Sequence, residues 1–166
     1  FDYDRRTRID TLDGDFLDLD WHRRGHERIA ILSHGLEGST QRSYMRGMAR
    51  ALARRGWDVL AWNLRGCSGT PNRRLRTYHS GATEDLAVVV DHALKAGYPA
   101  VALLGFSLGG NLTLKYLGER GPDVDPRVQA AAAFSVPVDL RSGARQLARP
   151  TNWHYVQYFL RTLRAK

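Results

Sequence analysis

The chain has 166 residues, enough for one domain with a hydrophobic core but not for two. Its hydrophobic share of 43% is ordinary for a globular protein, and no apolar run approaches the length of a membrane span. The formal charge of +8 raises nucleic acid and anionic membranes as partners, but the arginines are spread from Arg5 to Arg164 rather than gathered in one patch. Aromatic residues do not interleave with the clearest stripe, Arg42, Arg46, Arg50 and Arg54, so we expect a solvated surface, no nucleic-acid partner and no stable membrane insertion.

The first predicted elements are two short strands, residues 7–12 and 15–21, on either side of Asp13-Gly14, which is a strong hairpin signal. In the second strand, apolar residues alternate imperfectly with aspartates, as in a hairpin at the edge of a sheet. Residues 28–33 form a compact apolar run, which predicts a buried strand that ends at His34-Gly35.

A helix is predicted next, with Ser39 or Thr40 as its cap and Gly56 at its end. The pattern assigns it two opposite faces. The apolar face is expected to hold Tyr44, Met48, Ala51 and Leu52, and the basic face Arg42, Arg46, Arg50 and Arg54.

Residues 57–63 predict a second buried strand, and residues 64–80 a loop rich in glycine, proline and arginine. A loop of this length with no element of its own tends to be functional. Its Cys67 is the only cysteine in the sequence, which excludes an internal disulfide framework and favours a cytoplasmic protein. We expect Cys67 to be a small buried residue, with a reactive thiol as the alternative, and His79 to be a turn residue, with a place in the site as the alternative.

Helices are predicted over residues 83–96 and 108–119, with a central strand from Val101 between them. A further strand covers residues 128–136, and the remainder has the pattern of one or two amphipathic helices. Apolar strands that alternate with helices indicate an α/β fold, in which a mainly parallel sheet has helices on both faces. The opening hairpin adds antiparallel strands.

The sequence Gly105-Phe106-Ser107-Leu108-Gly109 ends the central strand and opens a helix, which is the context of a nucleophile elbow with the pattern G-x-S-x-G. So sharp a turn strains the serine backbone, and we expect Gly105 and Gly109 to remove side chains that would collide with Ser107. The hydroxyl would stand clear of the sheet, above the free N–H groups of the helix start. An ordinary glycine-rich turn is the alternative.

Acyl transfer through Ser107 requires donors for the developing oxyanion. The N–H of Leu108, next to the nucleophile, is one expected donor. We expect Leu36 to supply the second, because Gly35 lets the backbone after the early strand turn toward the elbow. For His34-Gly35, a plain strand-to-helix turn is the alternative.

A base and an orienting acid are harder to identify. Asp139 and His154 follow Ser107 in the chain order serine, acid, histidine. His154 lies in an aromatic, helical stretch that favours a packing or surface role, and Asp139 also suits a turn or a helix cap. The histidines have no metal-ligand spacing, so we expect neither a metal nor another cofactor.

Four motifs carry a resemblance to a known family. They are residues 34–39 (HGLEGS), 63–69 with 71–73 (NLRGCSG and PNR), 78–81 (YHSG) and 105–111 (GFSLGGN). In this order they resemble the α/β-hydrolase superfamily and, more narrowly, its YheT-like branch of esterases, the AB hydrolase 4 family. The resemblance extends from about Arg8 to the end of the chain.

The resemblance implies a serine hydrolase of carboxylic esters, with small-molecule or lipid substrates and with relatives that act on phospholipids. It implies a core over residues 1–140, truncated before its last strands, and the start of a helical cap over residues 141–166. It places acid and base beyond Lys166, so we expect the 166 residues alone to be inactive and the sheet edge to be covered by a missing C-terminal half or another chain. A catalytically inactive fragment or binding module is the alternative.

Overall fold

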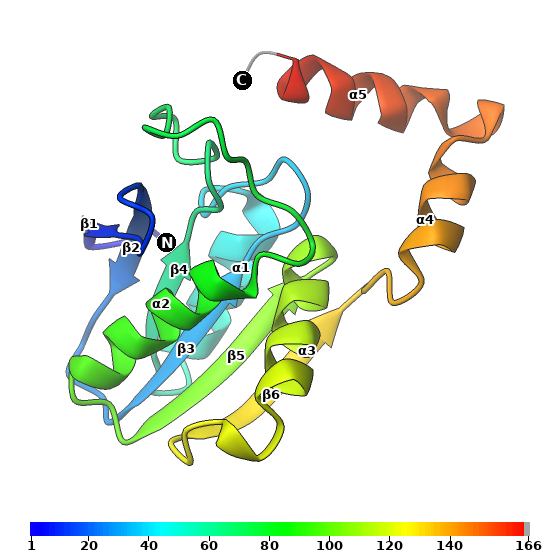
Figure 1. The fold of residues 1–166 in the computed structure, drawn as a ribbon. Helices are drawn as coiled ribbons and strands as arrows, with labels where there is room; N and C mark the ends of the chain where they lie inside the picture. Colours follow the sequence, from blue (N-terminus) through cyan, green and yellow to red (C-terminus); the bar gives the residue numbers. More distant parts are fainter. Residues whose placement is uncertain (165–166) are drawn as a thin grey trace.

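One mixed β-sheet organises the structure, a computed structural model that describes residues 1–164 (Figure 1). In this part of the chain the strands are β1 (Arg5–Asp10), β2 (Phe16–His22), β3 (Arg28–Ser33), β4 (Asp58–Trp62), β5 (Ala100–Phe106) and β6 (Val128–Phe134). Their spatial order is β1-β2-β4-β3-β5-β6. β2 is antiparallel to both β1 and β4, whereas the remaining pairs are parallel. The predicted α/β fold with an antiparallel N-terminal hairpin is confirmed.

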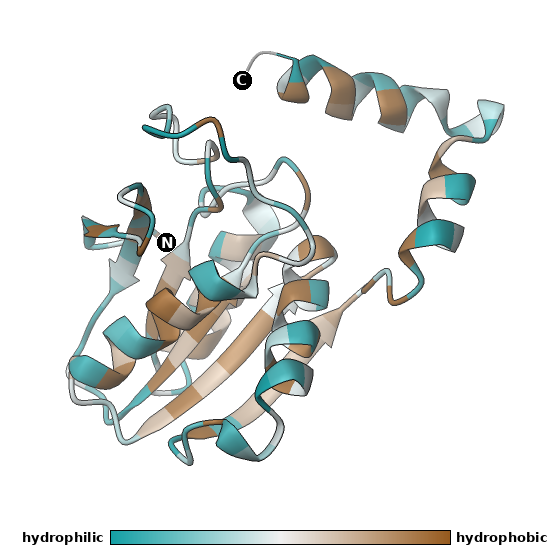
Figure 2. Ribbon diagram, in the orientation of Figure 1, coloured by the Kyte–Doolittle hydropathy of each residue, from teal (hydrophilic) through white to brown (hydrophobic). Residues whose placement is uncertain are grey.

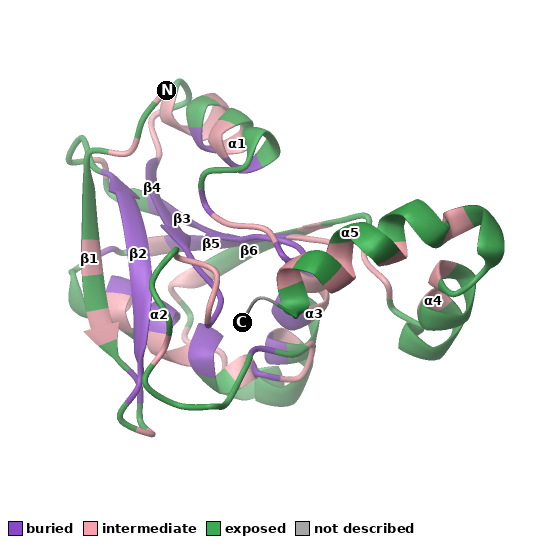
Figure 3. Cartoon of the chain, turned by 90° about the horizontal axis from the view of Figure 1, so that it is seen from above, coloured by how far each residue is buried: buried purple, intermediate pink, exposed green. Residues whose placement is uncertain are grey.

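Three helices cover the two faces of this sheet. α1 (Ser43–Ala53) packs on one face, and α2 (Thr83–Lys95) and α3 (Leu108–Arg120) lie side by side on the other. Two short 3-10 turns cover Gly121–Asp123 and Pro150–Asn152. α4 (Leu140–Leu147) and α5 (Trp153–Leu163) form an arm that leaves the end of β6, and α5 turns back above the carboxyl ends of the strands (Figures 1 and 3). The predicted boundary of a cap at residue 141 stays a prediction, and residues 165–166 lie outside the described residues.

The apolar core forms two layers, one on each face of the sheet. Successive residues of a strand point to opposite faces. Leu60 and Trp62 of β4 therefore join the layer beneath α2 and α3, while Val59 and Ala61 join the layer beneath α1. Strands β3, β4 and β5 are apolar along most of their length (Figure 2), as expected for strands that are covered on both faces.

The hairpin forms as predicted, but β2 is not an edge strand. Every residue of β2 is buried, because β4 pairs with its other side. The aspartates of β2 are tolerated inside because β1 places an arginine opposite each of them. Arg6 donates two hydrogen bonds of 2.7 and 2.8 Å to Asp20, and Arg8 donates two of 2.8 and 2.9 Å to Asp18. Of the two hairpin strands, β1 lies at an edge of the sheet and β2 does not.

The predicted start of the first helix is wrong. α1 begins at Ser43, with Arg42 in the capping position and no hydrogen bond from a capping side chain. Neither Ser39 nor Thr40 caps it; the hydroxyl of Thr40 donates instead to the buried carboxylate of Asp20. A buried acceptor thus competes successfully for the hydroxyl that the local pattern assigned to the helix.

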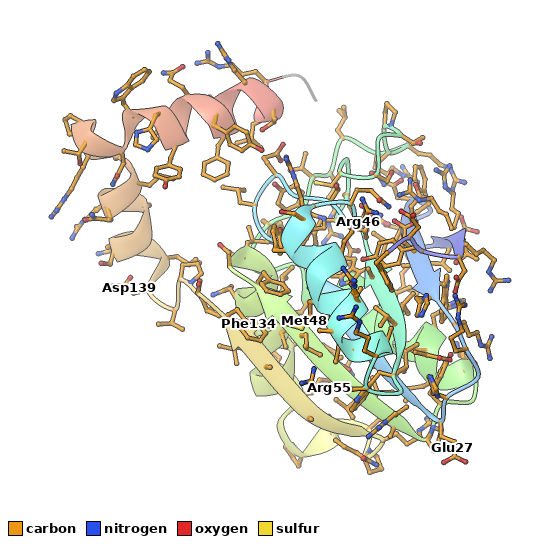
Figure 4. All side chains as sticks on the ribbon, turned by 180° about the vertical axis from the view of Figure 1, so that it is seen from behind. Glu27, Arg46, Met48, Arg55, Phe134 and Asp139 are labelled. Carbon is orange, nitrogen blue, oxygen red and sulfur yellow. The ribbon has the colours of Figure 1, made fainter. Side chains whose placement is uncertain are left out.

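The predicted faces of α1 are confirmed only in part: Met48 and Leu52 pack against the core, but the two most buried residues of the helix are others. Met45 and Ala49 are its buried residues, whereas Tyr44 is 39% exposed. Arg46, on the predicted basic face, is half-buried, and its guanidinium donates to the carbonyl oxygen of Phe1 at 2.9 Å and to Asp2 at 2.6 Å. Figure 4 shows Arg46 and Met48 on this helix. The helix therefore uses part of its arginine stripe to fasten the N-terminal residues.

β6 forms the other edge of the sheet and is open to solvent along most of its length. Its sequence, VQAAAAF, is apolar apart from one glutamine. An apolar edge strand with free backbone groups is a template for pairing with a further strand. Among residues 1–164 no helix is both long and apolar enough to cross a membrane.

Candidate active site

The bend between β5 and α3 presents Ser107. Its backbone has φ 51° and ψ −117°, a left-handed conformation that costs a residue with a side chain about 1–3 kcal/mol. The Ser107 amide donates to the carbonyl oxygen of Phe134 at 2.8 Å, and the Asn111 amide donates to the Ser107 carbonyl at 3.0 Å. These two bonds tie the strained residue to β6 on one side and to the first turn of α3 on the other.

The glycines around Ser107 permit close packing between strand and helix. A Cβ on Gly105 would lie 2.3 Å from the carbonyl oxygen of Gly109, and a Cβ on Gly109 would lie 2.4 Å from that of Ser33. A Cβ on Gly110 would meet the side chain of Val136 at 2.6 Å. The atoms nearest to the first two of these Cβ positions thus belong to the backbone of Gly109, Gly110, Ser33 and His34 rather than to Ser107, where the sequence led us to expect the collision. The glycines allow α3 to start directly against β3 and β5.

His34 is buried and fixed by two hydrogen bonds. Its Nε2 accepts the N–H of Leu64 at 3.1 Å, which leaves the proton on Nδ1, and Nδ1 donates to the carbonyl oxygen of Gly35 at 2.8 Å. The ring therefore links the turn after β3 to the chain that leaves β4. It is a structural side chain, because both nitrogens are engaged by the backbone.

The turn after His34 lies beside Ser107. A Cβ on Gly35 would lie 3.2 Å from the Cβ of Ser107. Within this turn the N–H of Gly35 donates to the hydroxyl of Tyr44 at 3.1 Å, and the N–H of Glu37 donates to the hydroxyl of Tyr78 at 2.9 Å. The amide of Gly38 closes the turn on the carbonyl of Gly35 at 3.0 Å.

Two amides near Ser107 donate to no atom of residues 1–164. They are the N–H groups of Leu36, between the two tyrosine-bonded amides, and of Leu108, the first residue of α3. The first N–H groups of a helix have no partner within it. The structure thus brings the turn that carries Leu36 to the bend that carries Ser107 and Leu108.

A shallow cavity of about 270 Å³ opens at Ser107. Aromatic rings form much of its wall: Phe106 stacks on Phe134 with centroids 5.0 Å apart, and Tyr44 packs on Phe106 at 4.9 Å. Phe159 of α5 closes one side. Larger cavities of about 350 Å³ lie elsewhere, two among loops and one against α1, but none of them contains Ser107. This cavity is apolar and suits a hydrocarbon group.

Both tyrosine hydroxyls that bond the turn keep their protons near neutral pH. Burial raises the pKa of Tyr44 above its ordinary value, against an opposing hydrogen bond from Gly35. Burial also raises the pKa of Tyr78, and the hydrogen bond to Glu37 raises it further. Each hydroxyl is therefore a neutral group that can accept a backbone N–H.

The remaining candidate residues lie apart from this cluster. Asp139 stands at the base of the arm (Figure 4), where its carboxylate accepts the N–H of Ser142 at 3.0 Å and caps α4. His154 is exposed on α5 and packs against Tyr155, with ring centroids 4.3 Å apart. No hydrogen bond within residues 1–164 joins either of them to Ser107.

Two further candidate residues, Cys67 and His79, lie in the loop of residues 64–80. Cys67 is half-buried, and His79 is exposed with its Nδ1 accepting the N–H of Gly81 at 3.1 Å. In the part of the chain that the structure describes, no three His, Cys, Asp or Glu side chains are grouped to hold a metal ion.

Sequence reasoning missed the residues that surround the bend. The sequence patterns place Tyr44 only on a helix face and Phe134 only in a strand. Glu37 and Tyr78 enter only as members of the HGLEGS and YHSG motifs. Glu37 and Tyr78 are 41 residues apart, so no local pattern could have paired them.

Comparisons with known proteins agree with the geometry. Residues 25–164 match the family described as “Serine aminopeptidase, S33”. The chain is 36% identical to “Putative esterase YheT” of Escherichia coli (strain K12), over 95% of this chain and 47% of that protein. It is 32% identical to “Phospholipase ABHD3” of Homo sapiens, over 95% of this chain and 41% of that protein. The chain spans about half the length of the curated relatives it matches.

Solved structures show the same fold. The esterase Pf2001 of Pyrococcus furiosus superimposes with a TM-score of 0.76 and 25% sequence identity, covering 96% of this chain and 60% of that one. An α/β-hydrolase, GrgF of Penicillium sp. sh18, superimposes with a TM-score of 0.68 and 22% identity, covering 80% of this chain and 45% of that one.

Proposed function

Because the chain belongs to the α/β-hydrolase family described as “Serine aminopeptidase, S33”, we propose that it carries the nucleophile of a serine esterase, which cleaves carboxylic esters through an acyl-serine at Ser107. The observation that supports this most is the strained Ser107 backbone, beside two amides that have no other partner among residues 1–164. Strain of this kind persists where the surrounding structure enforces it, and it clusters at active sites.

The proposed chemistry assigns a role to each group at the bend. The Ser107 hydroxyl oxygen attacks the ester carbonyl carbon while its proton passes to a base, and the carbonyl oxygen becomes an oxyanion facing the N–H groups of Leu36 and Leu108. Collapse expels the alcohol with that proton and leaves an acyl-serine. Water then attacks the acyl carbon and gives a proton to the same base, and the base passes that proton to the Ser107 oxygen as the bond to the acyl carbon breaks and the acid leaves.

The base and the acid are proposed to come from outside the described residues. His34 is engaged at both ring nitrogens, while His154 and Asp139 make no hydrogen bond to Ser107. The curated relatives extend beyond the region matched here. We therefore propose that the 166 residues alone do not turn over esters, and that a further segment or another chain supplies the missing groups and covers β6.

The substrate is proposed to present an apolar acyl group. The wall formed by Phe106, Phe134 and Phe159 suits hydrocarbon, and the relatives named above are an esterase and a phospholipase. A small-molecule or lipid ester fits both observations. A cytoplasmic location stays a prediction.

A fluorophosphonate probe tests the proposal, since it phosphonylates an activated serine and leaves an idle one untouched. The natural protein that contains these residues should be labelled, and Ser107→Ala should abolish labelling. Ser135→Ala is the matched control, because Ser135 also lines the cavity and also has a positive φ of 52°. Labelling that survives in Ser107→Ala, or no labelling of the natural protein, would instead favour the inactive or binding-module alternative.

A further inference from the structure

A buried hydrogen-bond pair fastens the turn that carries the Leu36 amide. The Tyr78 hydroxyl accepts the N–H of Glu37 at 2.9 Å and donates to the Glu37 carboxylate at 2.5 Å. Tyr78 is 8% exposed and Glu37 is 5% exposed. A doubly bonded, buried pair of this kind holds its backbone more firmly than a solvated one.

Glu37 has a strained backbone conformation. Its φ is 50°, in the left-handed region that disfavours a residue with a side chain. Three contacts hold it there: Tyr78 bonds its amide and its carboxylate, and the Arg42 guanidinium donates to its carbonyl oxygen at 3.1 Å. Because Glu37 directly follows Leu36, its conformation fixes the Leu36–Glu37 peptide, which adjoins the Gly35–Leu36 peptide that carries the Leu36 N–H.

The loop that contributes Tyr78 is anchored at its start. The Leu64 amide donates to His34, and the buried guanidinium of Arg65 makes two bonds of 2.7 Å to Asp85 and two of 2.8 and 3.1 Å to Asp13. The loop is thus tied to α2 and to the β1–β2 hairpin. These bonds fix the start of the loop from which Tyr78 reaches the turn.

We propose that Tyr78 is a positioning residue, which acts through Glu37 to hold the N–H of Leu36 toward the carbonyl oxygen bound at Ser107. This inference rests on the proposed function. Tyr78 touches no reacting atom in this arrangement. Its hydroxyl makes the oxyanion donor available by keeping the turn in one conformation.

The test compares Tyr78→Phe with Tyr98→Phe in the natural protein. Tyr98 is a matched control, since it is 4% exposed and its hydroxyl donates to the buried Asp58 carboxylate at 2.8 Å, away from Ser107. With p-nitrophenyl butyrate as the probe, Tyr78→Phe should lower kcat by about tenfold to a hundredfold and change KM by less than about twofold. Binding of a trifluoromethyl ketone, which forms a tetrahedral adduct, should weaken by about the same factor as kcat. Tyr98→Phe should keep both within about twofold.

A second readout separates this proposal from the function itself. Amide hydrogen exchange of residues 34–38 should quicken by about tenfold in Tyr78→Phe and stay unchanged in Tyr98→Phe, with or without ester turnover. Two variants of Glu37 give a second test if Tyr78→Phe does not fold. Glu37→Gln keeps an acceptor oxygen for the Tyr78 hydroxyl and should retain most of kcat, whereas Glu37→Met removes that acceptor and should lower kcat as Tyr78→Phe is expected to do. Unchanged exchange in Tyr78→Phe, or equal losses of kcat in both tyrosine variants, would overturn the proposal. If the unmodified protein does not hydrolyse the ester at all, this would instead count against the proposed function.

Discussion

Gly105 and Gly109 touch each other across the bend, and a Cβ on Gly105 would lie 2.3 Å from the Gly109 carbonyl oxygen. Ser107 therefore sits on a bend in which strand and helix backbones are in direct contact. This contact explains why the residues two positions before and two positions after the serine cannot carry side chains, and it places the start of α3 against the carboxyl end of β5.

Gly105→Ala should be strongly destabilising. The added methyl group would overlap backbone atoms of Gly109 and Gly110, which cannot move without displacing α3 from the sheet. We expect a loss of more than about 3 kcal/mol in the free energy of unfolding, measured by urea denaturation. Gly118→Ala in the same helix is the control: nothing lies within 4 Å of its Cβ position, so it should gain up to about 1 kcal/mol. Similar stabilities for the two variants would contradict this account.

The sequence predicted the bend because its pattern is local. Gly105, Ser107 and Gly109 lie within five residues, between an apolar run and a helical pattern, and the structure has the predicted strand and helix there. Most of the other strands and helices are predicted from patterns that are equally local, and their type and order are confirmed.

Contacts between distant segments could not be predicted in this way. The burial of β2 depends on its pairing with β4, some forty residues later, and the hydroxyl of Thr40 is taken by Asp20 from that same strand. The Glu37–Tyr78 contact likewise joins two turns that no periodicity connects. In these three cases the partner of a polar group is chosen by tertiary packing rather than by neighbours in the chain.

Ser107→Gly should stabilise the chain while abolishing fluorophosphonate labelling. Removing the side chain relieves about 1–3 kcal/mol of strain at φ 51°, against about 0.4–1 kcal/mol of added freedom in the unfolded state, so we expect a net gain near 1 kcal/mol. Ser39→Gly, at a position without a positive φ, should lose stability instead. Thermal or urea denaturation of both variants checks the difference in sign. A loss of stability in Ser107→Gly would show that the serine is not strained.

Arg65→Met should be far more damaging than an exposed arginine change. Arg65 is 2% exposed in its side chain, bonds Asp13 and Asp85, and lies 3.4 Å from Asp15, so its removal takes the paired cation away from the buried carboxylates of Asp15 and Asp85. We expect a loss of about 3–5 kcal/mol by urea denaturation. Arg127→Met is the control, because the Arg127–Asp125 pair is largely solvated, and it should lose less than about 1 kcal/mol. Equal losses of stability in the two variants would mean that the buried Arg65 network stabilises the fold no more than a surface ion pair does.

The stability of the chain should fall in acid because of the β2 carboxylates. Burial alone would raise the pKa of Asp20, but hydrogen bonds from Arg6 and Thr40 lower it below its ordinary value. A carboxyl with a lowered folded pKa stabilises the fold above its unfolded pKa of about 3.9, and this contribution is lost as the pH falls through the folded pKa. Asp20→Asn should therefore flatten the pH dependence of unfolding below about pH 4, and Arg6→Met should move the acid transition to higher pH. An unmoved transition in Arg6→Met would contradict the assignment.

The exposed β6 edge should make the 166-residue chain associate. Residues 129–132 of β6 are exposed, and the strand has no partner beyond β5 within residues 1–164. A flat, apolar edge favours pairing with another copy. We expect an average mass that rises with concentration in light scattering, and a lower mass when Ala131→Lys places a charge on this edge. Ala53→Lys, at the half-buried end of α1 and away from β6, is the control and should not reduce association. Monomeric behaviour of the unmodified chain at all concentrations would show that the β6 edge does not need a covering strand.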